Sequence, residues 1–202
     1  MEKGILNIHD NLLQDEFLYN LDKKLEYGEW KYNCTGGESK KFPYDNIREY
    51  KFWGLKLWEE NFNGLPYINS KYTSLTDQLF KFINFYNQKF TPELNLKPYF
   101  IHCNGQTIGQ DGHCHLDIHD NSSYNYYSLM IMINLQWDKD WGGQFEILEN
   151  ESNDSKVVKN IGYKAGRVIF FDGNYPHRGI APIIPNVLRK TLIIKLMSSN
   201  II

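Results

Sequence analysis

The sequence has little of what marks several common classes of protein. Only three of its 202 residues are cysteines (Cys34, Cys103 and Cys114), and no Cys-x-x-Cys pair occurs. A structural zinc ribbon is therefore not expected, and a reducing compartment is the simpler assumption. No apolar run approaches the roughly 18 residues of a transmembrane helix, and the first residues lack the apolar core of a secretory signal. We therefore expect a cytoplasmic protein with no membrane partner.

The sequence also has no large excess of charge of either sign. The 22 basic and 24 acidic residues leave a formal net charge of -2, which gives no electrostatic footprint for a nucleic-acid partner. The chain also lacks internal repeats, low-complexity tracts and linkers. Its length suits one domain with a sizeable core, so we expect a single domain over residues 1–202. These patterns do not specify an oligomeric state.

Aromatic side chains are what the sequence has in quantity, since 14 Tyr, 12 Phe and 5 Trp make up 15% of it. They suit a β-rich core or a lined pocket. Before residue 95 the spacing of apolar residues favours two helices with short strands. The expected elements are a strand over 4–9, a helix that Asp10 or Asn11 caps and that ends near Gly28, a strand over 29–34, a loop over 35–41, and a helix over 73–90 that Thr73 or Ser74 caps.

Residues 42–70 have no clean period, because aromatic residues alternate irregularly with charged ones. One interpretation is a segment that covers a substrate. The other, which we favour, is a peripheral layer packed on a sheet.

After Pro92 the pattern changes to short β-like runs that Gly, Asp, Asn and Pro interrupt. Helices followed by many short strands indicate an α+β fold, or an antiparallel sandwich or barrel with helices against one face. The expected strands are 99–103, 126–135, 144–148, 156–159, 167–171 and 188–197, with a turn over 137–143.

The stretch Gly109–Asp117 ends in His115-Leu116-Asp117. On an extended strand, an imidazole and a carboxylate two residues apart point to the same side, because side chains alternate with period 2. His177, which follows a later apolar run, can supply a third ligand. Such a 2-His-1-carboxylate set holds Fe(II) and leaves open positions on it. A His-x-Asp alone, however, is more often a surface or hydrogen-bonded pair.

Arg189 and Thr191 share one face of a predicted strand whose other face carries Leu188, Leu192 and Ile194. An arginine in apolar surroundings is costly unless an anion meets it, and its guanidinium fork pairs best with a carboxylate. That carboxylate belongs either to the protein or to a ligand. Because Arg189 follows a candidate metal ligand in a chain that carries His-x-Asp, we favour a ligand.

Taken in order, these segments resemble the iron(II)/2-oxoglutarate-dependent dioxygenases, in particular their prolyl-4-hydroxylase-like branch. The resemblance covers residues 95–197 and rests on the succession of His-x-Asp, a long strand, Gly142-Gly143, the run 166–172, His177 and Arg189-Lys-Thr. It implies a double-stranded β-helix (a jelly-roll, cupin-like barrel) over residues 95–197. The strand and helices of residues 1–94 would support this barrel by packing on one of its sheets. We therefore expect a fold of the α+β class that is mainly β.

The resemblance also implies roles for single residues. His115, Asp117 and His177 match the iron ligands, Arg189 matches the residue that binds the distal carboxylate of 2-oxoglutarate, and Thr191 matches its hydroxyl partner. Fe(II), 2-oxoglutarate and dioxygen are the implied cofactor and cosubstrates, with ascorbate as the reductant. We expect hydrogen-bond acceptors to hold the second ring nitrogen of both histidines.

The sequence departs from the family pattern at one contact with the cosubstrate. The branch usually has a tyrosine nine or ten residues before its first histidine ligand, where this chain has Gln106 and Gly105. Either the amide of Gln106 donates to the cosubstrate, or one of Tyr124, Tyr126 and Tyr127 replaces the tyrosine.

Two further histidines, His113 and His119, flank the motif. They are alternative ligands, a proton relay or, as we favour, polar residues at the rim of a pocket. His113-x-His115 is also similar to the metal motif of cupins. A cupin, however, needs a Glu four or five residues after the second histidine, where this chain has His119 and Asp120.

The sequence thus favours an Fe(II)- and 2-oxoglutarate-dependent hydroxylase that acts on an unactivated C–H bond. The resemblance implies peptidyl proline as the substrate, and a free amino acid or another small molecule stays open. Two other functions also stay open. One is a non-catalytic jelly-roll that binds a ligand or partner, and the other is a cupin-type metalloenzyme that does not use 2-oxoglutarate.

Overall fold

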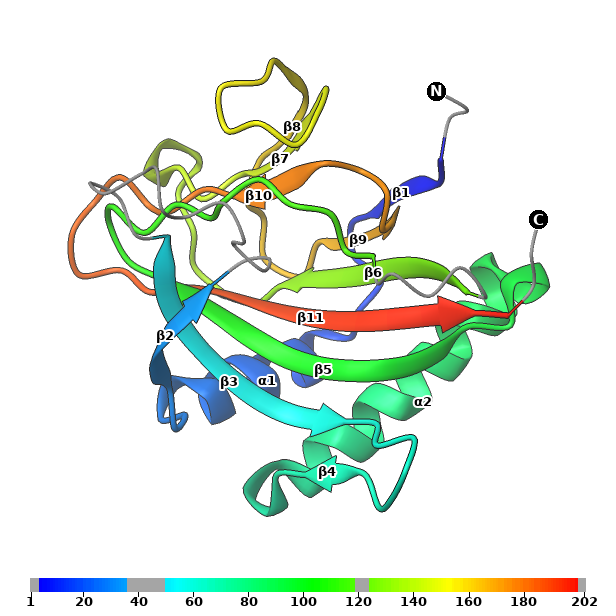
Figure 1. Cartoon of the computed structure of the whole chain (residues 1–202). Coiled ribbons are helices and arrows are strands. Elements are labelled where there is room, and N and C mark those ends of the chain that lie inside the picture. The colour runs from blue at the N-terminus through cyan, green and yellow to red at the C-terminus, as the bar shows by residue number, and fades with distance from the viewer. Residues whose placement is uncertain (1–3, 36–49, 119–123, 200–202) are drawn as a thin grey trace.

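The computed structural model describes residues 4–35, 50–118 and 124–199. The dominant feature of this part of the chain is one large antiparallel sheet, which sweeps across the molecule in Figure 1. A smaller sheet lies to one side of it, with β7 between β10 and β8. In spatial order the large sheet contains β1 (Leu6–His9), β9 (Val168–Asp172), β6 (Asn125–Met132), β11 (Arg189–Ser198), β5 (Lys97–Gln106), β3 (Lys51–Glu59) and β2 (Lys31–Thr35), with β4 (Tyr67–Ile68) paired to β3; the small sheet contains β10 (His177–Gly179), β7 (Phe145–Leu148) and β8 (Val157–Ile161).

Two helices, α1 (Asp15–Glu26) and α2 (Thr73–Phe90), cover the face of the large sheet that is turned away from the small sheet (Figure 1). Leu21 and Leu25 of α1 and Leu79 and Ile83 of α2 are buried in one apolar cluster with residues of β3, β5, β6, β9 and β11. Short 3-10 turns η2 (Ser70–Tyr72), η3 (Pro92–Leu94) and η4 (Lys139–Trp141) join some of these elements. No helix within the described ranges is long and apolar enough to cross a membrane.

A second apolar cluster fills part of the space between the two sheets. It contains Ile193 of β11 together with Met130, Phe145 and Phe171. Because side chains alternate along a strand, the neighbours of Ile193 in sequence point to the helices instead, and Leu192 belongs to the helix-side cluster. The large sheet is therefore buried on both faces, and the space between the sheets receives every second residue of β5 and β11.

The expected fold class is confirmed, since the structure is mostly β with two antiparallel sheets and few helices. The helix over 73–90 has the predicted bounds, but both predicted helix caps are wrong. The residue before α1 is Gln14 and the residue before α2 is Tyr72, and neither makes a side-chain cap. Asp10 instead accepts hydrogen bonds from Arg167 and Lys164, and Thr73 donates its hydroxyl to a carbonyl of the preceding turn η2. Asp10 is therefore engaged by long-range ion pairs and Thr73 by the preceding turn, so neither caps a helix.

The segment 42–70 contains a strand that the sequence did not predict. Residues 51–59 form β3 between β2 and β5, so the interpretation as a peripheral layer is wrong for this part. The register of β3 against β5 shifts between Lys56 and Trp58, and such an irregularity breaks the period-2 pattern from which a strand is predicted. Residues 42–49, most of the predicted loop 35–41, and His119 and Asp120 lie outside the described residues.

Candidate active site

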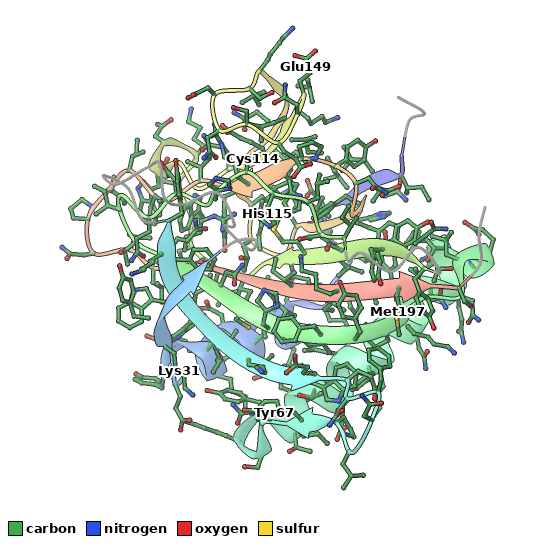
Figure 2. The ribbon with its side chains drawn as sticks, in the orientation of Figure 1. Lys31, Tyr67, Cys114, His115, Glu149 and Met197 are labelled. Carbon is green, nitrogen blue, oxygen red and sulfur yellow. The ribbon has the colours of Figure 1, made fainter. Side chains whose placement is uncertain are left out.

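His115, Asp117 and His177 converge between the two sheets, where Figure 2 shows His115. Each residue offers one ligand atom, and these atoms all lie within 4.8 Å of one another. Nε2 of His115 is 3.4 Å from Oδ1 of Asp117, and Nε2 of His177 is 3.5 Å from Oδ2 of the same carboxylate. Within the described part of the chain this is the one group of three such side chains close enough to share a metal ion.

The backbone around His115 and Asp117 is not the regular strand that the sequence predicted. His115 makes a single β-bridge with His177, in which each N–H donates to the carbonyl of the other at 3.1 and 3.0 Å. The N–H of Asp117 donates to the carbonyl of Gly173 at 2.8 Å. A Cβ at position 173 would lie only 2.6 Å from the carbonyl oxygen of Asp117, so a glycine is needed for this close approach. Local backbone pairing, rather than a long strand, therefore directs the two side chains to one point.

The three candidate ligand atoms lie close enough together to share one metal ion. Ligands about 2.1 Å from an ion and at right angles to each other are about 3 Å apart, slightly less than the distances found here. Nδ1 of His115 lies 2.8 Å from the carbonyl oxygen of His113, and Nδ1 of His177 lies 2.8 Å from that of Tyr175. Each carbonyl accepts a hydrogen bond from Nδ1–H, which leaves Nε2 free to ligate. The acceptors expected from the sequence are thus backbone carbonyls.

Asp117 is buried and ionised. One of its oxygens, Oδ2, accepts a hydrogen bond from Ser128 at 2.5 Å and pairs with the ammonium group of Lys195. Burial by itself raises the pKa of Asp117, but its interactions with Lys195, His177 and His115 outweigh burial and hold the pKa well below its usual range. Burial also lowers the pKa of His177 to about 3, so this imidazole is neutral at physiological pH. A carboxylate and a neutral imidazole are the forms that bind metal ions.

Arg189, at the start of β11, is 1% exposed and yet has an unpartnered nitrogen. Its Nε donates to the carbonyl of Gly143 and its Nη1 donates to Oε1 of Gln106, both at 2.7 Å, while Nη2 is buried without a hydrogen-bond partner. Within the described ranges no carboxylate forms an ion pair with it. Burial lowers the pKa of Arg189 to about 10, which keeps the group charged at neutral pH. The interpretation as a protein salt bridge is therefore not supported, and Nη2 is free to bind an anion from outside.

Gln106 lies directly opposite Arg189 in the register of β5 and β11. Its Nε2 donates to the carbonyls of Gln110 at 2.7 Å and Gly179 at 3.0 Å, and its Oε1 accepts from Arg189. Both amide hydrogens are thus used by the backbone, which suits a residue that holds the guanidinium in place. Thr191 is on the same face of β11 as Arg189, two residues further along the strand.

A cavity of about 800 Å³ joins these groups, and all six residues that the sequence selected line it. Its volume is within the usual range for small-molecule sites. Its wall also includes His102, Lys195 and Lys56, which the sequence analysis did not select. Alternation along the strands could have identified two of these residues. His102 is on the same face of β5 as Gln106, and Lys195 is on the same face of β11 as Arg189. Lys56 lies on β3, for which no period was visible.

The three tyrosines considered as cosubstrate contacts do not line the cavity. Tyr127 stacks on Phe170 within the helix-side cluster, Tyr126 packs against Tyr99, and Tyr124 is 37% exposed. The cavity therefore receives no tyrosine from this set.

His113 likewise does not line the cavity and is not in the metal-binding group. Its Nδ1 is hydrogen-bonded to the carbonyl of Cys114, and its ring packs edge-on against Tyr50. This arrangement suits the interpretation as a residue beside the pocket.

Comparisons with known proteins agree with this geometry. The model of the 2OG-Fe(II) oxygenase superfamily matches residues 99–193. No curated protein matches the sequence. Among solved structures, the chain is similar to an oxidoreductase of the 2OG-Fe(II) oxygenase family from Burkholderia pseudomallei, with a TM-score of 0.70 and 13% identity over 96% of this chain and 85% of that one.

Two prolyl hydroxylases are also similar in structure. The Pseudomonas putida prolyl-4-hydroxylase has a TM-score of 0.60 and 15% identity over 96% of this chain and 91% of that one. A Trichoplax adhaerens prolyl hydroxylase, solved with a peptide fragment of the hypoxia inducible factor oxygen degradation domain, has a TM-score of 0.61 and 16% identity over 96% and 83%. At such identities the likeness shows the shared fold alone, which for these oxygenases is the double-stranded β-helix.

The family match implies Fe(II), 2-oxoglutarate and dioxygen as cofactor and cosubstrates. The matched segment contains each residue of the metal-binding group and both Arg189 and Thr191. Residues 99–193 therefore match the 2OG-Fe(II) oxygenase superfamily, and the chain shares the fold of the solved oxygenases.

Proposed function

We propose that this chain hydroxylates a C–H bond of a peptide or small-molecule substrate, with 2-oxoglutarate as cosubstrate and ascorbate as the reductant that maintains Fe(II). His115, Asp117 and His177 would hold the metal, and Arg189 and Thr191 would bind the distal carboxylate of 2-oxoglutarate. One observation carries this proposal: the three ligand atoms and the free Nη2 of Arg189 belong to the same cavity. The two prolyl hydroxylases among the structural neighbours support a prolyl substrate by analogy of fold.

The bound iron would supply the activation of dioxygen. In the balanced reaction one oxygen atom enters the substrate as a hydroxyl group, and the other enters succinate as 2-oxoglutarate loses carbon dioxide. The protein's own contribution is to bind and orient. Arg189 would fix one end of the cosubstrate, while Met130, Phe145 and Phe171 line the cavity with apolar surface that limits the access of water.

The geometry also separates this function from its two rivals. A cupin-type enzyme without 2-oxoglutarate has no use for a buried guanidinium whose free nitrogen faces a ligand cavity. A non-catalytic binding protein does not need a metal-binding group in which backbone carbonyls hold Nδ1 of both histidines. These observations favour the oxygenase.

The test is a comparison of two neighbouring histidines. We expect the wild-type chain to bind Mn(II), an Fe(II) substitute, at micromolar concentration, and to form succinate from 2-oxoglutarate when supplied with Fe(II), ascorbate and a panel of proline peptides and free amino acids. The variant His115→Ala should lose both properties, and the variant His113→Ala, which lies outside the metal-binding group, should keep both.

A wild-type chain that binds no Mn(II) would favour the non-catalytic binding protein. Full activity in the variant Arg189→Ala would favour the cupin-type enzyme instead. Thermal unfolding of each variant controls for loss of the fold.

A further inference from the structure

The wall that β11 contributes to the cavity carries two cations, Arg189 and Lys195. An extended strand rises about 3.3 Å per residue, so two positions six residues apart are separated by about 20 Å. The two cations therefore mark opposite ends of the cavity and suit two different ligands. We propose that Lys195 determines substrate choice by binding a carboxylate group of the substrate, an inference that rests on the function proposed above.

Lys195 has one ion-pair partner among the described residues, and this partner is the candidate metal ligand Asp117. The side chain of Lys195 is 15% exposed, and no other carboxylate of the described residues forms an ion pair with it. A divalent ion held by Asp117 would compete with Lys195 for that carboxylate and would repel the ammonium group. A cation held in a cavity with little water is costly without another anion. A carboxylate group on the substrate supplies that anion close to the metal.

His102 provides a second polar group at the same place. It faces Ile193 in the register of β5 and β11, and Lys195 faces the next cavity-side residue of β5, Phe100. Nδ1 of His102 is buried and has no hydrogen-bond partner within the described part of the chain. Burial keeps this imidazole neutral, so that Nδ1–H can donate to a carboxylate oxygen without adding charge. An ammonium group and an unpartnered ring nitrogen thus converge at one end of the cavity.

Apolar rings adjoin these two groups. Phe100 stacks on His102 with 4.6 Å between the ring centres, and Tyr67 also lines the cavity. Lys56 lies 5.1 Å from the centre of the Tyr67 ring, but its side chain is 44% exposed and Glu59 compensates its charge. A cation that is 15% exposed and faces Phe100 in the sheet register fits a small molecule with a carboxylate next to an apolar group, such as an amino acid with a free carboxylate.

The experiment uses matched pairs of probes. The protein is loaded with Mn(II) and 2-oxoglutarate, and the probes are N-acetyl-L-proline and N-acetyl-L-phenylalanine, each as the free acid and as the primary amide. Broadening of the probe proton signals by Mn(II) reports binding next to the metal. We expect the acids to bind at least about tenfold more tightly than the amides, because a charge-assisted hydrogen bond is lost in the amide.

Variants of Lys195 then assign the preference to this residue. The variant Lys195→Met should bind acids and amides equally weakly, and the variant Lys195→Arg should keep the preference for acids. The control is Lys164→Met, which also removes an ion-paired lysine but lies outside the cavity, and it should behave as the wild type does. Affinity for 2-oxoglutarate should be the same in Lys164→Met as in the wild type.

Several outcomes would overturn the inference. They are equal binding of acids and amides to the wild type, a preference for acids that persists in Lys195→Met, and no binding of either acid up to about 10 mM. A loss of 2-oxoglutarate affinity in Lys195→Met would instead assign the lysine to the cosubstrate. Failure of the proposed function is distinct from all of these, because the wild type would then not bind Mn(II) or 2-oxoglutarate at all.

Discussion

The two faces of β11 carry opposite chemistry although both are buried. Leu192, Ile194 and Leu196 pack against the helices and are at most 1% exposed. On the other face, Arg189 and Thr191 are equally buried but line the cavity. A strand covered on both sides is usually apolar throughout. Polar residues at alternate positions of such a strand therefore indicate a ligand-binding surface, and Nη2 of Arg189 is left there without a partner among the described residues.

The largest expected effect comes from the helix-side face and concerns stability alone. The variant Leu192→Ala removes a fully buried side chain, and we expect it to lower the free energy of unfolding by about 2–5 kcal/mol. The affinity of the folded protein for 2-oxoglutarate should not change. Denaturant titration and calorimetry measure the two quantities separately. A loss of affinity without a loss of stability would show that the two faces are not independent.

The cavity-side face should give the reverse result. We expect the variant Arg189→Gln to weaken 2-oxoglutarate binding by about 10- to 100-fold, because a hydrogen-bonded charge pair contributes about 1.5–3 kcal/mol. Its free energy of unfolding without ligand should change less than that of Leu192→Ala. The matched control is Arg167→Gln, since Arg167 pairs with Asp10 and does not line the cavity. Undiminished binding in Arg189→Gln would contradict the assigned role.

The pH dependence of stability should come from the cavity side of the large sheet, because the buried histidines His102 and His177 both line the cavity. Burial lowers the pKa of each to about 3, from an ordinary value near 6.5. Below pH 6.5 the unfolded chain takes up protons that the folded chain does not. The metal-free protein should therefore be fully stable above pH 6.5 and lose up to about 1.4 kcal/mol per pH unit for each histidine as the pH falls toward 3.

Denaturant titrations at pH 7, 6 and 5 measure this slope. We expect the variant His102→Gln to have a shallower slope than the wild type. An identical slope in the two proteins would mean that His102 does not contribute to it.

The smallest expected effect concerns Thr191. The variant Thr191→Val keeps the shape of the side chain and removes its hydroxyl group, so we expect 2-oxoglutarate to bind about two- to tenfold more weakly. Calorimetry of the two proteins side by side provides the measurement. A change as large as that of Arg189→Gln would mean that the hydroxyl group does more than add one hydrogen bond.

The sequence was most informative where a local rule determines the structure. Alternation along a strand placed Arg189 and Thr191 on one face and Leu192 and Ile194 on the other, as the two apolar clusters show. Helical spacing gave the bounds of α2. The same alternation extends to Lys195, although its ion pair with Asp117 depends on contacts between distant segments that no local pattern encodes.

The sequence was least informative where distant segments determine the structure. β3 was missed because the irregular register against β5 disturbs its period. The contact of Gln106 with Arg189 follows from the register of two strands that are far apart in sequence, so the glutamine was assigned to the cosubstrate rather than to the arginine. The predicted cap of α1 failed for the same reason, since distant charges engage Asp10, whereas the predicted cap Thr73 of α2 is used by the turn just before that helix.

The reciprocal backbone hydrogen bonds between His115 and His177 have a consequence for how such a site is found in other sequences. They fix the distance between the two imidazoles through strand pairing, while the sheet register separately fixes Arg189 opposite Gln106. The interval of twelve residues between His177 and Arg189 is then set by the connecting residues 180–188, where Ile183 is 65% exposed. Insertions there would leave the candidate metal-binding atoms in place, so a search that requires this interval would overlook proteins with the same arrangement of side chains.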